Sequence, residues 1–133
     1  MSEPLKIHHI AVAVEDMDGA LAFWRDALGL NLGGVEDVPE QEAQVAFLPV
    51  GESHVELVKP TTEDSGMARY IQKRGPGIHH LCLEVADIDA ALDALKKKDV
   101  RLINETPLTR DNGRRYAFIH PKSTGGVLIE LYE

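Results

Sequence analysis

Hydrophobic and polar positions first indicate a β-strand at residues 6–14, which are apolar and rich in β-branched side chains. A helix is expected next, because the Asp16 carboxylate can accept hydrogen bonds from the free N–H groups at a helix start. Apolar side chains then recur at spacings of three and four, and Gly29 suits the end of the helix. The helix residues expected in the core are Phe23, Trp24 and Leu28.

Three further strands complete this first unit. A short strand is expected near residues 30–35. Strands at 44–48 and 54–58 form a predicted hairpin, with Gly51 in its turn. The first unit is therefore predicted to be β-α-β-β-β.

The same pattern returns at a constant offset of 71 residues. Residues 7–21 and 78–92 share a pair of histidines, two aspartates and an Ala-Leu pair at matching places, without a gap. Duplication of one supersecondary unit explains this agreement. The second copy predicts a strand at 77–85, a helix capped by Asp87, and strands near 100–104, 116–120 and 127–132.

A chain of 133 residues has the size of one domain. The predicted organisation is a first module at 5–60, a connecting helix at 64–74 and a second module at 77–133. Neither module of about 60 residues buries much apolar surface alone. We therefore expect an α+β fold in which two tandem βαβββ modules form one partly closed, cupped β-sheet.

The alternation of side chains along a strand predicts where the histidines point. In the first strand His8 shares a face with Ile10 and Val12, and this apolar face is expected to pack against the helix. His9 is then on the opposite face, towards the space between the modules. His80 has the equivalent position in the second copy.

Two glutamates are expected on the same side as these histidines. Glu56 and Glu130 occur in Val-Glu-Leu and Ile-Glu-Leu, where the apolar neighbours face the helix. Two imidazoles and two carboxylates suit a divalent transition metal, which also removes the cost of burying the carboxylates. The predicted metal ligands are His9, Glu56, His80 and Glu130. Alternatively, the histidines hydrogen-bond within the core and each glutamate is a solvated strand residue.

Composition and charge narrow the possible partners. Lys and Arg total 14 and Asp and Glu total 22, which gives a formal net charge of −8. A protein this acidic is a poor general nucleic-acid binder. No apolar run approaches the roughly 20 residues of a membrane helix, and from its polar residues the N-terminus is not expected to act as a secretory signal. The single Cys82 excludes an internal disulfide, so we expect a cytoplasmic protein with neither a nucleic acid nor a membrane as partner.

The motifs of the chain resemble the vicinal-oxygen-chelate superfamily, which includes glyoxalase I, extradiol dioxygenases, and fosfomycin and bleomycin resistance proteins. The resemblance is strongest to the methylmalonyl-CoA epimerase family and covers nearly the whole chain. It is carried by the opening strand at 7–14, the hairpin at 46–57, the strand at 77–85 and the tail at 120–131.

This resemblance implies a vicinal-oxygen-chelate fold and a homodimer that interconverts (R)- and (S)-methylmalonyl-CoA. It implies that the four predicted ligands hold Co²⁺, with Zn²⁺, Ni²⁺ or Mn²⁺ as other possibilities. The reaction is a 1,1-proton transfer at C2, and the ion stabilises an enolate. Some members of the family have Glu at the position of Val45 and Gln at that of Glu56. We therefore expect Glu56 and Glu130 to act as the two bases, with Glu42 or water as alternatives.

Substrate-binding residues are expected where positive charge or an apolar wall faces the site. Phe47 has the right strand parity, Lys122 and Ser123 lie in the family-like tail, and Arg115 belongs to a basic stretch. Two other functions remain open. One is a glyoxalase I-type lyase that acts on a glutathione hemithioacetal, and the other is a non-catalytic drug-binding protein of the same fold.

Overall fold

The computed structural model describes residues 4–133 and contains both helices and strands, which confirms the predicted α+β class. Two compact units are present. One comprises Ile10–His79, and the other comprises His80–Glu133 together with residues up to His9. Strands β1 (Pro4–Ala13) and β5 (Gly77–Val85) each contribute residues to both units. No helix within residues 4–133 is long and apolar enough to cross a membrane.

The Ile10–His79 unit is built on antiparallel strands. Strands β3 (Ala43–Val50) and β4 (Ser53–Pro60) form the predicted hairpin, in which Gly51 adopts a positive φ of 59°. Strand β2 (Gly34–Val38) pairs with the other edge of β3, and η2 (Pro39–Gln41) is a 3₁₀ turn between these two strands.

The strand expected near 30–35 begins later than predicted. The Leu30 N–H donates to the Trp24 carbonyl at the end of the helix, so this part of the chain still belongs to the helix terminus. Pairing with β3 starts at Gly33, whose N–H donates to the Phe47 carbonyl over 2.7 Å. A Cβ atom on Gly33 would lie 3.2 Å from that carbonyl oxygen, so glycine suits this close approach.

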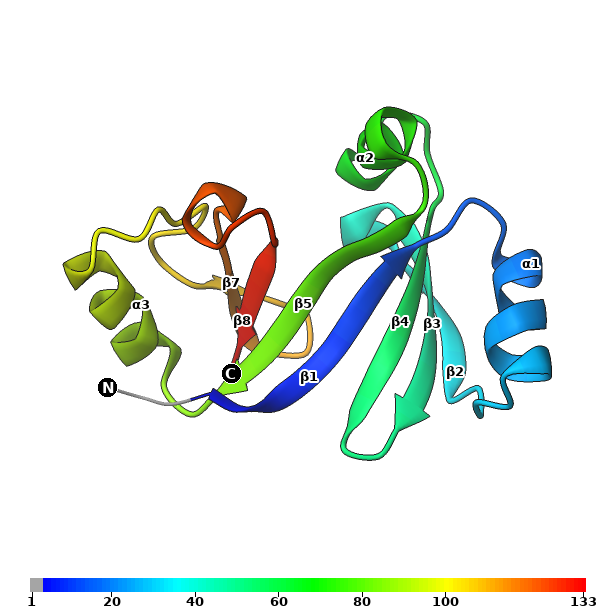
Figure 1. The fold of residues 1–133 in the computed structure, drawn as a ribbon, viewed down its shortest axis with the longest axis horizontal. Coiled ribbons are helices and arrows are strands. Elements are labelled where there is room, and N and C mark those ends of the chain that lie inside the picture. Colours follow the sequence, from blue (N-terminus) through cyan, green and yellow to red (C-terminus); the bar gives the residue numbers. More distant parts are fainter. Residues whose placement is uncertain (1–3) are drawn as a thin grey trace. The chain divides into compact units, whose positions relative to one another are not determined.

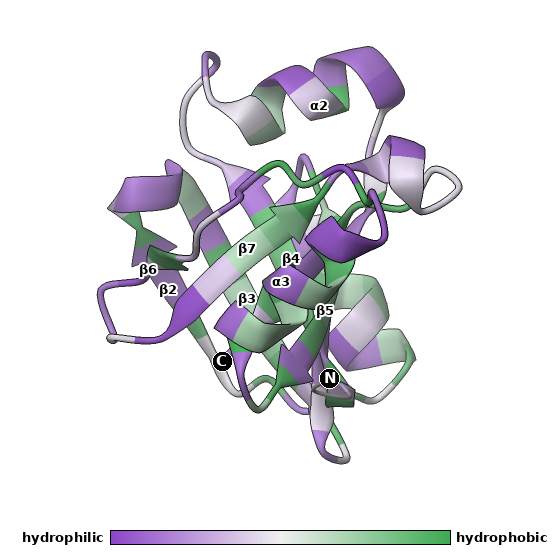
Figure 2. Cartoon of the chain, turned by 90° about the vertical axis from the view of Figure 1, so that its left-hand side faces the viewer, coloured by the Kyte–Doolittle hydropathy of each residue, from purple (hydrophilic) through white to green (hydrophobic). Residues whose placement is uncertain are grey.

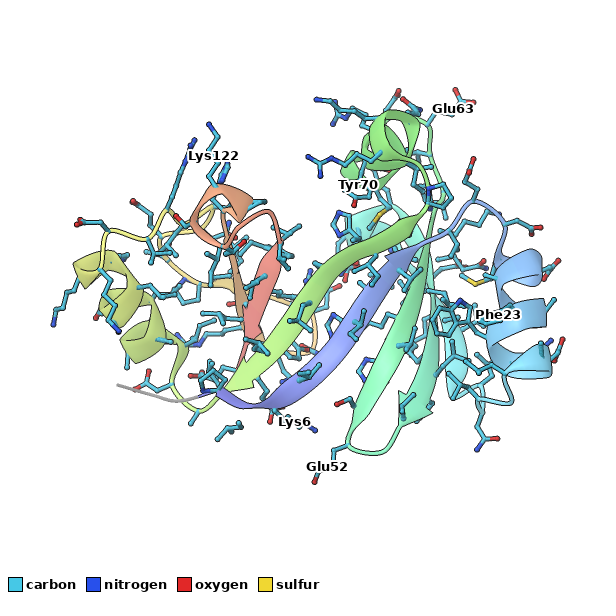
Figure 3. The ribbon with its side chains drawn as sticks, in the orientation of Figure 1. Lys6, Phe23, Glu52, Glu63, Tyr70 and Lys122 are labelled. Carbon is cyan, nitrogen blue, oxygen red and sulfur yellow. The ribbon has the colours of Figure 1, made fainter. Side chains whose placement is uncertain are left out.

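The first helix is irregular. It consists of α1 (Met17–Leu21) and a π-helical segment, η1 (Ala22–Ala27), in which the Leu28 N–H donates to the Phe23 carbonyl five residues back. The wider turn changes which side chains face the sheet. Trp24 packs against the core as expected, but Phe23 and Leu28 are each 53% exposed, so their predicted core positions are wrong. Figure 3 labels Phe23 on this segment.

The core of this unit lies between the first helix and one face of the sheet, as Figure 1 shows. Alternation along β1 places Val12 in this core, as predicted. The buried residues of the cluster are Val12, Val14, Met17, Leu21, Ala46, Leu48 and Leu57. Helix α2 (Gly66–Arg74) follows β4, and the Ser65 hydroxyl accepts a hydrogen bond from the Ala68 N–H at its start.

The second unit has a parallel strand pair at its centre. Strand β8 (Ile129–Tyr132) pairs in parallel with β5, and β7 (Arg115–Ile119) pairs antiparallel with β8. The short β6 (Leu108–Thr109) completes this part of the sheet. Helix α3 (Ile88–Lys97) packs its apolar residues against these strands, and the colours of Figure 2 show both hydrophobic and hydrophilic residues along it.

Two predicted strands of this unit differ from the structure. Within the expected strand at 100–104, only Leu102 forms a β-bridge, and its partner is Ile119. The ladder does not extend to Asn104, because the Phe118 N–H donates to the Asn104 side chain and not to a backbone carbonyl. The last strand starts at Ile129 and not at residue 127. The chain first forms the 3₁₀ segment η3 (Pro121–Ser123). A turn follows, in which the Thr124 hydroxyl donates to the Val127 carbonyl and accepts a hydrogen bond from the Val127 N–H.

Candidate metal centre

Three of the four predicted ligands meet at one point in the second unit. His9 comes from β1, His80 from β5 and Glu130 from β8. The Oε1 atom of Glu130 lies 3.0 Å from His80 Nε2 and 3.4 Å from His9 Nε2. The two Nε2 atoms are 3.2 Å apart. Three potential ligand atoms therefore form a small triangle.

The strand register explains why Glu130 turns towards the imidazoles. Its neighbours Ile129 and Leu131 pack in the cluster under α3, so alternation directs Glu130 to the opposite face. In the sheet, Glu130 lies beside Cys82 of β5 and Phe118 of β7. Only 1% of Glu130 is exposed, so its charge needs partners inside the protein.

The imidazoles supply those partners. Burial opposes ionisation of Glu130, but the hydrogen bonds and charges of His80 and His9 outweigh it and hold the pKa of this carboxyl well below its usual range. Glu130 is therefore a carboxylate at any ordinary pH. An ionised oxygen facing two imidazole nitrogens is a typical donor set for a transition metal.

The spacing of the triangle also fits one ion. With metal–ligand bonds of about 2.1 Å, neighbouring ligand atoms are about 3.0 Å apart in an octahedron and about 3.4 Å apart in a tetrahedron. The three measured separations of 3.0, 3.2 and 3.4 Å match this range. The Cys82 sulfur also lies within 4.8 Å of ligand atoms of His9 and Glu130. These residues fit a divalent transition metal.

His8 supports the ring of His9. The two Nδ1 atoms are 2.8 Å apart, and the His8 ring packs edge-on against Tyr132 with centroids 4.7 Å apart. This contact differs from the packing against the first helix that the alternation predicts for His8. A hydrogen bond to the second nitrogen of a ligand histidine commonly fixes its tautomer and orientation.

Glu56, the fourth predicted ligand, belongs to the Ile10–His79 unit. Its Oε2 atom lies 2.8 Å from His54 Nε2, and both side chains are partly buried. Phe47 is the register partner of Glu56 in β3, and its ring centroid is 5.8 Å from that of His54. Metal binding by Glu56 and substrate binding by Phe47 stay predictions. The period of two between His54 and Glu56 is the sequence signal for their contact.

Arg110 is a site residue that sequence reasoning did not single out. It lies in the loop between β6 and β7, and its Nη2 donates to Glu130 Oε2 over 2.9 Å. The guanidinium carbon is 3.6 Å from the ring centroid of Tyr116. The basic stretch at 110–115 was visible in the sequence, but only the hairpin geometry shows which arginine reaches Glu130.

Comparison with known proteins identifies the family. A family model described as the Glyoxalase/Bleomycin resistance protein/Dioxygenase superfamily matches residues 8–118. The chain belongs to this superfamily. It is 39% identical to the human mitochondrial methylmalonyl-CoA epimerase over 127 residues, which is 95% of this chain and 72% of the human protein. It is 37% identical to the ethylmalonyl-CoA/methylmalonyl-CoA epimerase of Cereibacter sphaeroides, with 95% of this chain and 96% of that protein covered.

A solved structure within the superfamily agrees with this likeness. The methylmalonyl-CoA epimerase from Mycobacterium tuberculosis has a TM-score of 0.88 and 38% sequence identity, covering 100% of this chain and 90% of that one. The resemblance predicted from the motifs is thus confirmed at the level of fold and family.

The other predicted substrate-binding residues belong to the unit that contains His80–Glu133. Lys122 is exposed on η3 and points outward, as Figure 3 shows. The Ser123 hydroxyl accepts the Arg101 N–H. Arg115 pairs with Asp89 and Glu133 at 3.0 and 2.7 Å, so its guanidinium anchors the start of α3. Substrate binding by these residues stays a prediction.

Proposed function

We propose that this chain interconverts (R)- and (S)-methylmalonyl-CoA. The observation that carries the proposal is the triangle of His9, His80 and Glu130, in a chain similar over 95% of its length to methylmalonyl-CoA epimerases. Epimerisation at C2 removes a proton that lies between a thioester carbonyl and a carboxylate. The reaction therefore needs a group that stabilises negative charge and groups that move the proton.

The proposed cofactor is one divalent ion held by the two histidines and Glu130, with Glu56 as the fourth ligand. Co²⁺ is the first candidate, followed by Zn²⁺, Ni²⁺ and Mn²⁺. When bound, the ion would supply a Lewis acid that takes up charge at the thioester oxygen. Two carboxylate ligands would balance its charge, which leaves the centre able to accept an anionic substrate.

Proton transfer is assigned to Glu56 and Glu130. The lowered pKa makes Glu130 a weak base while His80 and His9 hold its Oε1 atom. Glu130 can accept a proton only after this oxygen has moved away from the imidazoles. The Oε2 atom of Glu56 lies 2.8 Å from His54 Nε2, and this contact supports Glu56 as the first base, because an imidazole can relay a proton.

The proposed substrate contacts are Lys122 and Ser123 for the coenzyme A part, with Phe47 as an apolar wall and Arg115 as a further cation. The proposal includes a homodimer in the cytoplasm. Each of these assignments depends on the resemblance to methylmalonyl-CoA epimerases and on the chemistry of a substrate with several negative charges.

Hydrogen exchange at C2 tests the function. Purified protein stripped of metal is mixed with methylmalonyl-CoA in D₂O, with and without added Co²⁺, and deuterium at C2 is followed by mass spectrometry. We expect fast exchange that depends on Co²⁺. No exchange with the ion, or turnover only of the methylglyoxal–glutathione adduct, would contradict the proposal. Protein that binds bleomycin but no metal would instead be a drug-binding member of the superfamily.

A further inference from the structure

The two oxygens of Glu130 have different partners. Oε1 faces the Nε2 atoms of His9 and His80, whereas Oε2 accepts a hydrogen bond from Arg110 over 2.9 Å. A carboxylate with no partner on its second oxygen can rotate and bind an ion through both oxygens. The hydrogen bond from Arg110 to Oε2 opposes this rotation and so opposes binding of an ion through both oxygens.

Arg110 is itself held in place. Its guanidinium carbon lies 3.6 Å from the centroid of the Tyr116 ring, and its side chain is 20% exposed. The loop that carries Arg110 is closed by the hydrogen bond from its N–H to the Arg114 carbonyl, at 2.8 Å. A planar cation stacked on an aromatic ring donates in a fixed direction, so it also fixes the plane of the carboxylate.

We propose that Arg110 is a positioning residue that restricts Glu130 to a single ion-binding oxygen. The inference rests on the proposed metal site and adds a residue to it. Groups that hydrogen-bond to a metal ligand typically change metal affinity by about 10- to 100-fold when they are removed. Arg110 acts in this way through Oε2 and does not itself touch the ion.

The same loop supplies a matched control. Arg114 also stacks on a tyrosine, with its guanidinium carbon 4.1 Å from the Tyr132 centroid, and it also pairs with a carboxylate. That carboxylate is Glu84, at 3.1 Å. Arg114→Met therefore removes a similar stacked ion pair from the same loop, while the bond between Arg110 and Glu130 stays.

The test measures Co²⁺ binding directly. Affinity is determined by competition with a chelator, and the visible absorption of bound Co²⁺ reports its coordination number. We expect Arg110→Met to bind Co²⁺ about 10- to 100-fold more weakly, with changed absorption bands. Arg110→Lys keeps a donor for Oε2 and is expected to restore part of the affinity. Arg114→Met is expected to match the wild type in both affinity and spectrum.

Wild-type affinity and an unchanged spectrum in folded Arg110→Met would overturn the inference, as would an equal loss in Arg114→Met. If circular dichroism shows that Arg110→Met does not fold, Tyr116→Leu takes its place. This change loosens Arg110, so Co²⁺ binding unchanged from the wild type would again refute the inference.

The inference and the proposed function fail differently. A wild-type protein that binds no divalent ion overturns both. A wild-type protein that binds Co²⁺, shows the loss in Arg110→Met and exchanges no hydrogen at C2 overturns the function alone and supports the role of Arg110.

Discussion

At the scale of single residues, burial and hydrogen-bond partners determine whether each glutamate suits metal binding or proton transfer. Glu130 is almost fully buried and has hydrogen-bond partners on both oxygens, so it suits the role of a metal ligand and can act as a base only after Oε1 has left the imidazoles. Glu56 is partly buried, and its Oε2 atom lies 2.8 Å from His54 Nε2. Glu42 is exposed and accepts a hydrogen bond from the Thr62 hydroxyl at 2.8 Å. Three carboxylates of the same chemical type therefore differ in burial and in hydrogen-bond partners.

Replacement of Glu56 by glutamine tests its role in proton transfer. The amide keeps the size of the side chain but cannot accept the C2 proton, so we expect deuterium exchange to fall by about 100-fold or more at full Co²⁺ occupancy. Occupancy is measured by elemental analysis, and Glu42→Gln is the control, with wild-type exchange expected. Unchanged exchange in Glu56→Gln would remove this residue from the role, and a loss in Glu42→Gln would assign the role to Glu42.

At the scale of elements, side chains at strand and helix ends set the boundaries that the periodic pattern does not. Helix α3 begins where the Asp87 carboxylate accepts the Ala90 N–H, as the sequence predicts. Asp16 occupies the same position before α1, but its side chain makes no capping hydrogen bond. Helix α3 has an additional anchor, because Glu133 accepts the Ile88 N–H at 2.9 Å and also pairs with Arg115.

The Glu133 anchor predicts a pH-dependent stability. The Ile88 N–H and the Arg115 guanidinium hold the pKa of Glu133 below its usual value of 4.5. A lowered carboxyl pKa in the folded state adds stability above the unfolded-state pKa, and this stability is lost as the pH falls through the folded value. We expect Glu133→Gln to lower the free energy of unfolding by about 1–2 kcal/mol at pH 7, and by progressively less below pH of about 4.

Urea unfolding at a series of pH values measures this effect. Glu105→Gln, an exposed glutamate of the same unit, is the control and is expected to change stability little at any pH. The same loss for Glu133→Gln at pH 7 and in acid would refute the proposed ionic contribution.

At the scale of the whole molecule, the candidate centre joins strands that are far apart in sequence. His9, His80 and Glu130 come from the beginning, the middle and the end of the chain. An unfolded chain cannot hold these three groups at separations near 3 Å without a large loss of entropy. An ion that binds them therefore binds the folded state and stabilises it.

Removal of metal is accordingly expected to lower the Tm. At a free Co²⁺ concentration of about 100 times the Kd, linkage predicts a stabilisation of about 2.7 kcal/mol, which is a shift of several degrees. Differential scanning calorimetry with and without EDTA measures it. His80→Ala is expected to abolish the shift, and a shift of equal size in that variant would show that the ion binds elsewhere.

The amino-acid sequence by itself determined the duplicated pattern, the α+β class and the faces on which His9, His80 and Glu130 lie. These features follow from local periodicity, because alternation along a strand requires no knowledge of its neighbours. Only the tertiary structure decided that Arg110 reaches Glu130 and that Phe23 lies outside the core. The first depends on the shape of a hairpin loop, and the second on a π-helical turn formed when the helix packs on the sheet. Such contacts come from residues whose spacing carries no periodic signal, so they appear only when the strands and loops are placed in space.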